Sequence, residues 1–262
     1  MITRYRVSFG GVQLDSLDDN IAILDVQHTQ PSRVVRKMTT ANLDGYDIGE
    51  TKVGQRTVTV SFELHIYDIK ERNRVCQAVN AWAAAGKTLL VNDRDGQRLE
   101  NVVCEQFADI DSVRNWTDPL TLVFATTSNP YWRSVDAVTR TLTGKGVSGT
   151  MTLDGNVSSS LVGVEVTATT AITSMQITVG SRFLKLTGLT IATGQKVVVD
   201  YLKDRYMRIK GNGSSIMAKL DPTSSDLLLA ECGKSTSIGV SAYNGSSSVK
   251  ITAEFTARGC WR

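Results

Sequence analysis

The chain has 262 residues, of which 41% are hydrophobic and 21% are charged, as in a folded globular protein rather than a disordered one. Its net charge is +3, with 15 basic against 17 acidic residues over 1–134 and 14 against 9 over 135–262. This excess is too small for the dense basic face of a nucleic-acid-binding domain. No apolar run approaches the ~20 residues that span a bilayer, and Met1 leads directly into a strand pattern. We therefore expect neither membrane insertion nor a signal peptide.

The first part of the chain predicts two strands and a polar segment. Alternating side chains indicate strands at Tyr5–Phe9 and Ile21–His28, and Gly10-Gly11 is typical of a tight hairpin turn after the first of them. Residues 29–56 are polar and contain the turn pair Asp44-Gly45. This segment is either a long loop or an extended hairpin arm, and long segments of this kind are usually functional or disordered.

A long strand and one helix follow. Apolar and polar residues alternate over Arg56–Tyr67, which is the clearest strand pattern in the chain. The helix is expected over Asp68–Ala85, with Asp68 as N-cap and Gly86 at its end. We expect its buried face to carry Ile69, Cys76, Val79, Trp82 and Ala83. Further strands are predicted at Thr88–Val91, Val102–Ile110 and Leu120–Thr126.

The strongest break in the pattern falls at Ser128-Asn129-Pro130-Tyr131-Trp132, because proline cannot donate to a strand ladder and Asn-Pro favours a turn. Beyond it we expect a helix-free half built of short strands, which is typical of a β-sandwich or jelly roll. The predicted strands are Leu161–Thr167, Met175–Val179, Phe183–Leu186, Lys196–Asp200, Tyr206–Ile209, Ile216–Leu220, Ser237–Ala242 and Val249–Phe255. The prediction is a mainly β protein of two domains, 1–134 and 135–262, with Arg133–Gly149 as a polar link.

The sequence offers no recognisable chemistry. It has two histidines, His28 and His65, without partners at metal-ligand spacing, and no P-loop, G-x-S-x-G or G-x-G-x-x-G motif. Cys76, Cys104, Cys232 and Cys260 form no C-x-x-C pair. We expect them to be four free thiols of a protein made in a reducing cytosol. The sequence predicts no catalytic residue, metal or cofactor, and it identifies no binding residue.

The order of these elements resembles the distal tail protein of long-tailed phages, the siphovirus tail-component family. The resemblance covers nearly the whole chain and rests on the polar arm with Asp44-Gly45, the strand after Gly54, the helix ending in Ala81-Trp82, and the strand closing on Asn129-Pro130-Tyr131. Asp44, Gly45, Gly54, Trp82, Pro130 and Tyr131 match as markers of the fold rather than as binding residues. The resemblance also implies a jelly-roll or galectin-like second domain.

What the resemblance implies is a structural hub at the virion tail tip, assembled in the host cytoplasm. Such proteins form rings, usually of six copies, that join the tail tube protein to the tip or receptor-binding proteins, and viral DNA passes without specific recognition. The first domain builds the ring. A carbohydrate-binding module that adheres to cell-surface polysaccharide remains the alternative, and a hydrolase is the least favoured one because no motif supports it.

Overall fold

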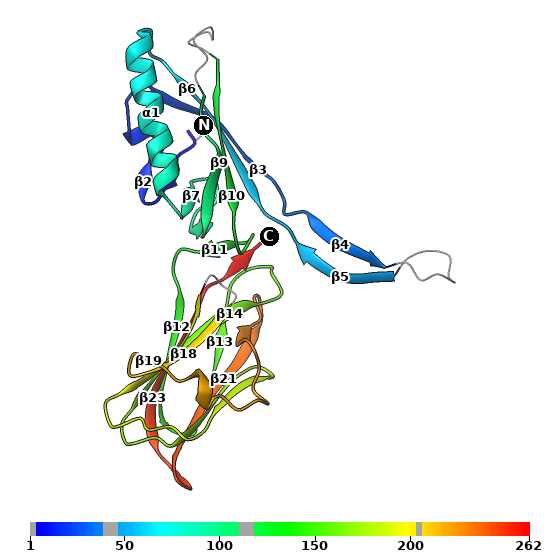
Figure 1. The fold of residues 1–262 in the computed structure, drawn as a ribbon, viewed down its shortest axis with the longest axis vertical. Helices are drawn as coiled ribbons and strands as arrows, with labels where there is room; N and C mark the ends of the chain where they lie inside the picture. The colour runs from blue at the N-terminus through cyan, green and yellow to red at the C-terminus, as the bar shows by residue number, and fades with distance from the viewer. Residues whose placement is uncertain (1–3, 39–46, 110–117, 203–205) are drawn as a thin grey trace. The chain divides into compact units, whose positions relative to one another are not determined.

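The computed structural model describes residues 4–38, 47–109, 118–202 and 206–262. The chain divides into two compact units, Met1–Trp132 together with Arg262, and Arg133–Trp261. We call them the first unit and the second unit, and each is described by itself. Figure 1 shows the helix and the strands of the first unit, and the strands of the second unit.

The first unit is built on an antiparallel sheet in the order β3-β6-β10-β9. The side chains of Val58, Val60, Phe62 and Leu64 on the central strand β6 are fully buried, which confirms the alternation predicted there. A smaller sheet in the order β2-β1-β7 lies beside it. The strands are β1 (Val7–Phe9), β2 (Val12–Gln13), β3 (Ile21–His28), β6 (Thr57–Leu64), β7 (Leu89–Val91), β8 (Gln97–Arg98), β9 (Val102–Gln106) and β10 (Leu120–Thr126), with a 3-10 helix at Leu14–Ser16.

The helix α1 (Ile69–Ala85) is capped as predicted, because the Asp68 carboxylate accepts a hydrogen bond of 2.8 Å from the backbone amide of Glu71. Its buried face differs from the prediction at one end. The side chain of Ile69 is 50% exposed, and the inward positions of the first turns are taken by Arg72 and Val75. Ile69 is the first residue of the helix.

Three aromatic rings join the helix to both sheets. Trp82 of α1 packs edge-on against Phe9 of β1 and Phe124 of β10, with ring centroids 5.8 Å and 6.0 Å apart. Phe9 and Phe124 approach each other to 4.8 Å. The Trp82 indole also donates a hydrogen bond of 2.9 Å to the carbonyl of Val12. The centre of the first unit is therefore an aromatic cluster that holds one helix and two sheets.

The polar segment forms an arm. Strands β4 (Arg33–Met38) and β5 (Asp47–Val53) pair antiparallel, as the hairpin alternative predicted, and they extend beyond the ends of β3 and β6 (Figure 1). The amide of Gly54 donates to the carbonyl of Ser32 at 2.7 Å and closes the base of the arm. Asp44 and Gly45 lie outside the described residues.

The second unit is a β-sandwich with a single core. One sheet has the order β12-β23-β14-β17-β18-β19, with β20 paired to β14, and the other has the order β13-β21-β15-β16, with β22 paired to β21. Val164 and Phe255 from the first of these sheets and Ile177 and Val240 from the second belong to one buried cluster. The mainly β fold with one helix is therefore confirmed for the described residues.

Seven of these strands were predicted, and their bounds differ from the predicted ones by no more than two residues. The strands are β11 (Trp132–Ser134), β12 (Val138–Lys145), β13 (Val147–Thr152), β14 (Ser160–Ala168), β15 (Ser174–Val179), β16 (Arg182–Leu186), β17 (Lys196–Leu202), β18 (Tyr206–Gly211), β19 (Ser214–Ser215), β20 (Leu229–Ala230), β21 (Ser235–Asn244), β22 (Ser247–Ser248), β23 (Lys250–Ala257) and β24 (Cys260–Trp261).

Two predictions in the second unit are wrong. The predicted link Arg133–Gly149 contains β12 and the start of β13, which pair along their lengths with β23 and β21. Most side chains of β12 are exposed, so the strand lacks the apolar alternation by which strands are recognised. The predicted strand Ile216–Leu220 is a 3-10 helix at Met217–Lys219 instead, whose residues are not buried.

The close approach of Gly86 to Phe9 leads to a stability prediction. Gly86 has an extended backbone with φ of −86°, but a Cβ built there would overlap the Phe9 ring. We expect Gly86→Ala to lower the free energy of unfolding of the first unit by about 1–3 kcal/mol, because Phe9 must leave its place against Trp82. Urea denaturation followed by circular dichroism measures this.

The matched control is Gly163→Ala in β14, where an added Cβ would have only ordinary contacts, the nearest at 3.6 Å from the Val199 carbonyl oxygen. It should change stability by less than about 1 kcal/mol. Equal effects of the two substitutions would contradict the packing argument for Gly86.

Candidate functional site

The turn between β7 and β8 is fixed to the start of the chain by Asn92. The Asn92 side-chain carbonyl accepts from the amide of Arg6 at 2.8 Å, and its amide group donates to the carbonyl of Arg4 at 2.9 Å. The backbone amide of Asn92 donates to the Arg6 carbonyl at 3.1 Å. This bracing brings the turn residues 93–97 and the first strand of the chain to the same surface.

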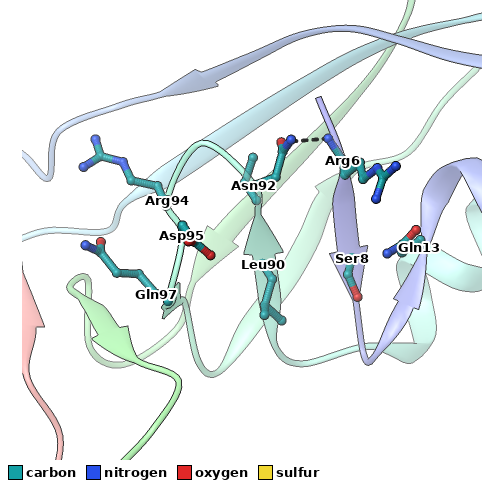
Figure 2. A pocket seen from close by; sticks show the side chains of 10 residues that line it. Arg6, Ser8, Gln13, Leu90, Asn92, Arg94, Asp95 and Gln97 are labelled. Atoms are coloured by element: carbon teal, nitrogen blue, oxygen red, sulfur yellow. Dashed lines mark hydrogen bonds between the residues drawn. The ribbon is translucent and has the colours of Figure 1, made fainter. Parts of the chain in front are cut away.

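A hollow of about 310 Å³ opens beside this turn. Figure 2 shows Arg94, Asp95 and Gln97 on one side of it and Arg6, Ser8 and Gln13 on the other, with Asn92 and Leu90 between. The charged side chains at the hollow are two arginines and one aspartate. It therefore suits a polar or acidic segment of a neighbouring protein better than an apolar small molecule.

The other side of the turn contacts the end of β3. Nε2 of His28 lies 2.7 Å from a carboxylate oxygen of Asp93. The His28 ring packs edge-on against Trp132 with centroids 5.4 Å apart, and the Arg94 guanidinium carbon lies 5.9 Å from the centroid of the same indole. We call His28, Arg56, Asp93, Arg94 and Trp132 the arm-base cluster, because His28 and Arg56 lie where the chain enters and leaves the arm.

Arg56 is the unusual member of this cluster, because its side chain is fully buried at 0% exposed. Its Nε donates a hydrogen bond of 2.7 Å to the carbonyl of Pro130, and its backbone amide donates to Thr126 Oγ1 at 3.1 Å. The two terminal guanidinium nitrogens have no hydrogen-bond partner within the part of the chain that the structure describes. Burial, and secondly the charge of Arg94, lower the pKa of Arg56 to about 10, so the group still carries its charge at neutral pH.

The structure brings together some of the residues matched by the resemblance. Gly54 closes the arm, and Pro130 accepts the hydrogen bond from Arg56, so both lie at the arm base. Tyr131 is half-buried next to Pro130, and its amide donates to the Asn129 side chain at 3.0 Å. Trp82 belongs to the aromatic cluster of the core instead. Asp44 and Gly45 are not among the described residues.

The arm-base cluster was not predicted from the sequence. His28 and Asp93 are separated by 65 positions, and no local motif links them. Arg56 stands two residues before Val58, so the alternation places it on the apolar face of the strand, and this was the one sequence signal for its burial. Pairing of β6 with β10 places this residue beside the turn before Trp132 and covers it.

Within the described ranges, no group of three or more His, Cys, Asp or Glu side chains could hold a metal ion. No helix in the same part of the chain is long and apolar enough to cross a membrane. In the second unit, a hollow of about 450 Å³ is lined by hydroxyl groups, with Arg182 and Glu231 at its rim.

Comparison with known proteins shows similarity in structure only. No protein-family model and no curated protein matches the chain. The crystal structure of the Dit protein of phage SPP1 matches with a TM-score of 0.71 and 18% identity, covering 98% of this chain and 99% of that one. The chain has the SPP1 Dit fold. SPP1 Dit is described as a paradigm of the hub of the adsorption apparatus in phages that infect Gram-positive bacteria.

A second solved structure is more distant. A chain of the phage P2 baseplate in its activated conformation with calcium matches with a TM-score of 0.47 and 9% identity, covering 99% of this chain and 98% of that one. At that score the alignment carries no argument about this protein. The match to SPP1 Dit spans both units, so it confirms at the level of the fold the resemblance that the order of elements predicted.

The burial of Arg56 leads to a second prediction. We expect Arg56→Met to leave the free energy of unfolding of the first unit unchanged or to raise it by about 1–4 kcal/mol, because it removes a buried charge that no carboxylate of the described residues compensates. Urea denaturation of the purified variant measures this. Arg56→Lys should lower stability, since lysine keeps the charge but cannot reproduce the geometry of the bond to Pro130. A loss of more than about 2 kcal/mol in Arg56→Met would show that the guanidinium stabilises the isolated fold.

Proposed function

We propose that this protein is the structural hub of a long-tailed phage tail tip, a ring that joins the tail tube to the tip or receptor-binding apparatus. The observation that carries the proposal is the match to SPP1 Dit, which runs over 98% of this chain and 99% of that one. A match of this extent includes the second unit as well as the first. It is therefore more specific than a shared β-sandwich, which unrelated proteins often have.

The edges of the main sheet in the first unit support ring formation. Strands β3 and β9 are the two edges of the β3-β6-β10-β9 sheet. Leu24 on β3 is 45% exposed, Val103 on β9 is 42% exposed, and Phe107, just after β9, is 43% exposed. A different apolar surface at each edge is what a head-to-tail contact between copies requires, and such contacts give a ring when the rotation closes. The arm offers a further surface by which one copy reaches the next.

The proposed role is structural rather than catalytic. Partners are further copies of this chain, most simply six, together with the tail tube protein and tail-tip proteins. The ring leaves a passage for viral DNA without reading its sequence, consistent with the small net charge of +3. The proposed location is the virion tail tip, after assembly in the host cytoplasm.

The ring is tested first by its mass. Native mass spectrometry of the full-length protein in near-physiological salt should give a closed multimer of six copies, because head-to-tail contacts bury the exposed apolar edges. Negative-stain images should show the same particle as a ring. A protein that is monomeric alone and also absent as a ring from intact tails would refute the proposal.

A matched pair of variants tests the edge contact. Phe107→Glu places a charge at the β9 edge and should convert the multimer to monomers without unfolding. Tyr206→Glu in the second unit, at a side chain that is 64% exposed, should leave the multimer intact. If both variants still assemble, the ring is closed by other surfaces.

We further propose that the domains 1–134 and 135–262 have separate roles. The first domain forms the ring, and the second domain is not needed for ring formation. A protein ending at Ser134 should fold and assemble, and one containing only the second domain should be a folded monomer, as gel filtration with light scattering would measure. The second-domain protein should begin at Arg133, because the amide of Ser134 donates to the Gly259 carbonyl at 3.0 Å. A monomeric first domain beside an oligomeric second domain would contradict this division.

The hydroxyl-lined hollow of the second unit favours one alternative function, binding of cell-surface polysaccharide. Ser181, Ser235, Thr236 and Ser237 offer donors and acceptors to sugar hydroxyls there, although no aromatic side chain lines the hollow. A glycan array distinguishes the two functions. Ring formation without glycan signal supports the hub, whereas a monomer with a signal that Ser237→Ala and Arg182→Ala remove supports the binding module.

A further inference from the structure

Two cysteines that are 28 positions apart in sequence lie against one segment of the second unit. Cys232 is in the turn between β20 and β21, and Cys260 begins the last strand, β24. Leu153 forms a parallel bridge with Cys232, and Gly155 forms one with Cys260. The amide of Gly233 donates to the Leu153 carbonyl at 2.7 Å, and that of Cys260 donates to the Asp154 carbonyl at 3.2 Å. The short segment Leu153–Gly155 therefore holds both cysteines in place.

The two thiols meet there. Cys260 is the hydrogen-bonding neighbour of the Cys232 thiol, and the Cys260 thiol also lies 3.5 Å from Ser160 Oγ and 3.7 Å from the Arg258 carbonyl oxygen. Gly155 makes this approach possible, because a Cβ built on it would overlap the backbone of Cys260. Glycine also follows Cys232 and precedes Cys260, at Gly233 and Gly259, so both cysteines have a flexible neighbour for the small movement that closing a disulfide requires.

We propose that Cys232 and Cys260 are a reversible redox pair that forms an intramolecular disulfide when the protein leaves a reducing medium for an oxidising one. The other two cysteines, Cys76 and Cys104, belong to the first unit. The thiol of Cys76 donates to the Ala108 carbonyl at 3.6 Å, and that of Cys104 donates to the Gln106 carbonyl at 3.1 Å. Those two stay reduced, and the second unit alone gains a cross-link.

The chemistry is thiol–disulfide exchange with a small-molecule disulfide such as oxidised glutathione. Cys232 is half-buried, whereas Cys260 is buried. The Cys232 thiolate therefore attacks the glutathione disulfide first and releases one glutathione thiolate. The Cys260 thiolate then attacks the mixed disulfide and releases the second. Two cysteine S–H bonds are lost and one S–S bond forms, while the two electrons and two protons end in two molecules of reduced glutathione.

The reduced pair is slow to react at neutral pH. The hydrogen bond with Cys260, followed by burial, raises the pKa of Cys232 well above its ordinary value. Because the thiolate is the reactive form, the rate of closure rises as the pH increases toward that pKa. The pair therefore stays reduced in a reducing medium and closes slowly in an oxidising one.

Closure would link the turn before β21 to the C-terminal strand β24. The closed loop contains β21, β22 and β23, and β21 and β23 are interior strands of the two sheets of the sandwich. A cross-link over a loop of this length restricts the unfolded chain and raises the midpoint of thermal unfolding of the second unit by several degrees. This inference does not depend on the hub proposal, because it concerns the second unit of a single chain.

The test compares the full-length protein before and after oxidation. Protein prepared with a reductant should have four titratable thiols. After incubation with oxidised glutathione at about pH 9 it should have two and should lose about 2 Da in mass, because two protons leave with the electrons. Peptide mapping should join the Cys232 and Cys260 peptides, the unfolding midpoint should rise, and dithiothreitol should reverse both changes.

Cys104→Ser is the matched control and should close its disulfide as the unaltered protein does. Cys232→Ser and Cys260→Ser should each fail to close and should show no rise in the unfolding midpoint on oxidation. Four thiols remaining after treatment, or a stable glutathione adduct on Cys232 without a cross-link, would overturn the proposal. Because these outcomes are read on the unaltered protein, they hold even if a serine variant fails to fold.

Discussion

The contact between Phe9, Trp82 and Phe124 is the interaction on which the first unit depends. Each ring comes from a different layer, β1, α1 and β10, so this one cluster fixes the helix and the small sheet against the main sheet. Gly86 must be small because the chain leaving the helix passes over the Phe9 ring. Its backbone is extended, so here packing rather than a left-handed conformation explains a glycine at the end of a helix.

A second constraint acts at the base of the arm and works against stability. Arg56 keeps a charge inside the protein with one side-chain hydrogen bond, to Pro130, and no carboxylate partner among its described contacts. A side chain of this kind costs stability in the isolated fold. It lies one residue before the main strand begins and two residues after the arm closes at Gly54. This loss of stability falls between the core and the arm, which is the segment that we propose contacts a neighbouring copy. Such a loss is expected where a residue is retained for assembly.

The sequence predicted those elements whose signals are local. The alternation over β6 is such a signal, because burial of one face of a strand selects apolar residues at every second position. The capping aspartate of α1 is another, because an unpaired amide in the first turn of a helix selects an acceptor side chain at the N-cap. Strand β12 was missed because its side chains face mostly outward and its Thr and Gly residues read as a link. The His28–Asp93 pair and the meeting of Cys232 with Cys260 depend on tertiary pairing across many residues, which no single-sequence pattern contains.

The two units also differ in how completely they cover their apolar surface. In the first unit, Leu24 and Val103 are exposed on the two strands of the main sheet that have a neighbour on one side only among the described residues. In the second unit, the large exposed side chains Leu202, Tyr206 and Tyr243 lie at or near the ends of hairpins, and Met217 lies on the 3-10 helix. An exposed apolar edge strand favours aggregation. Exposed apolar residues at both edges of this sheet are explained if another copy of the protein covers them. These exposed residues therefore support the proposal that copies of the protein meet through the first unit.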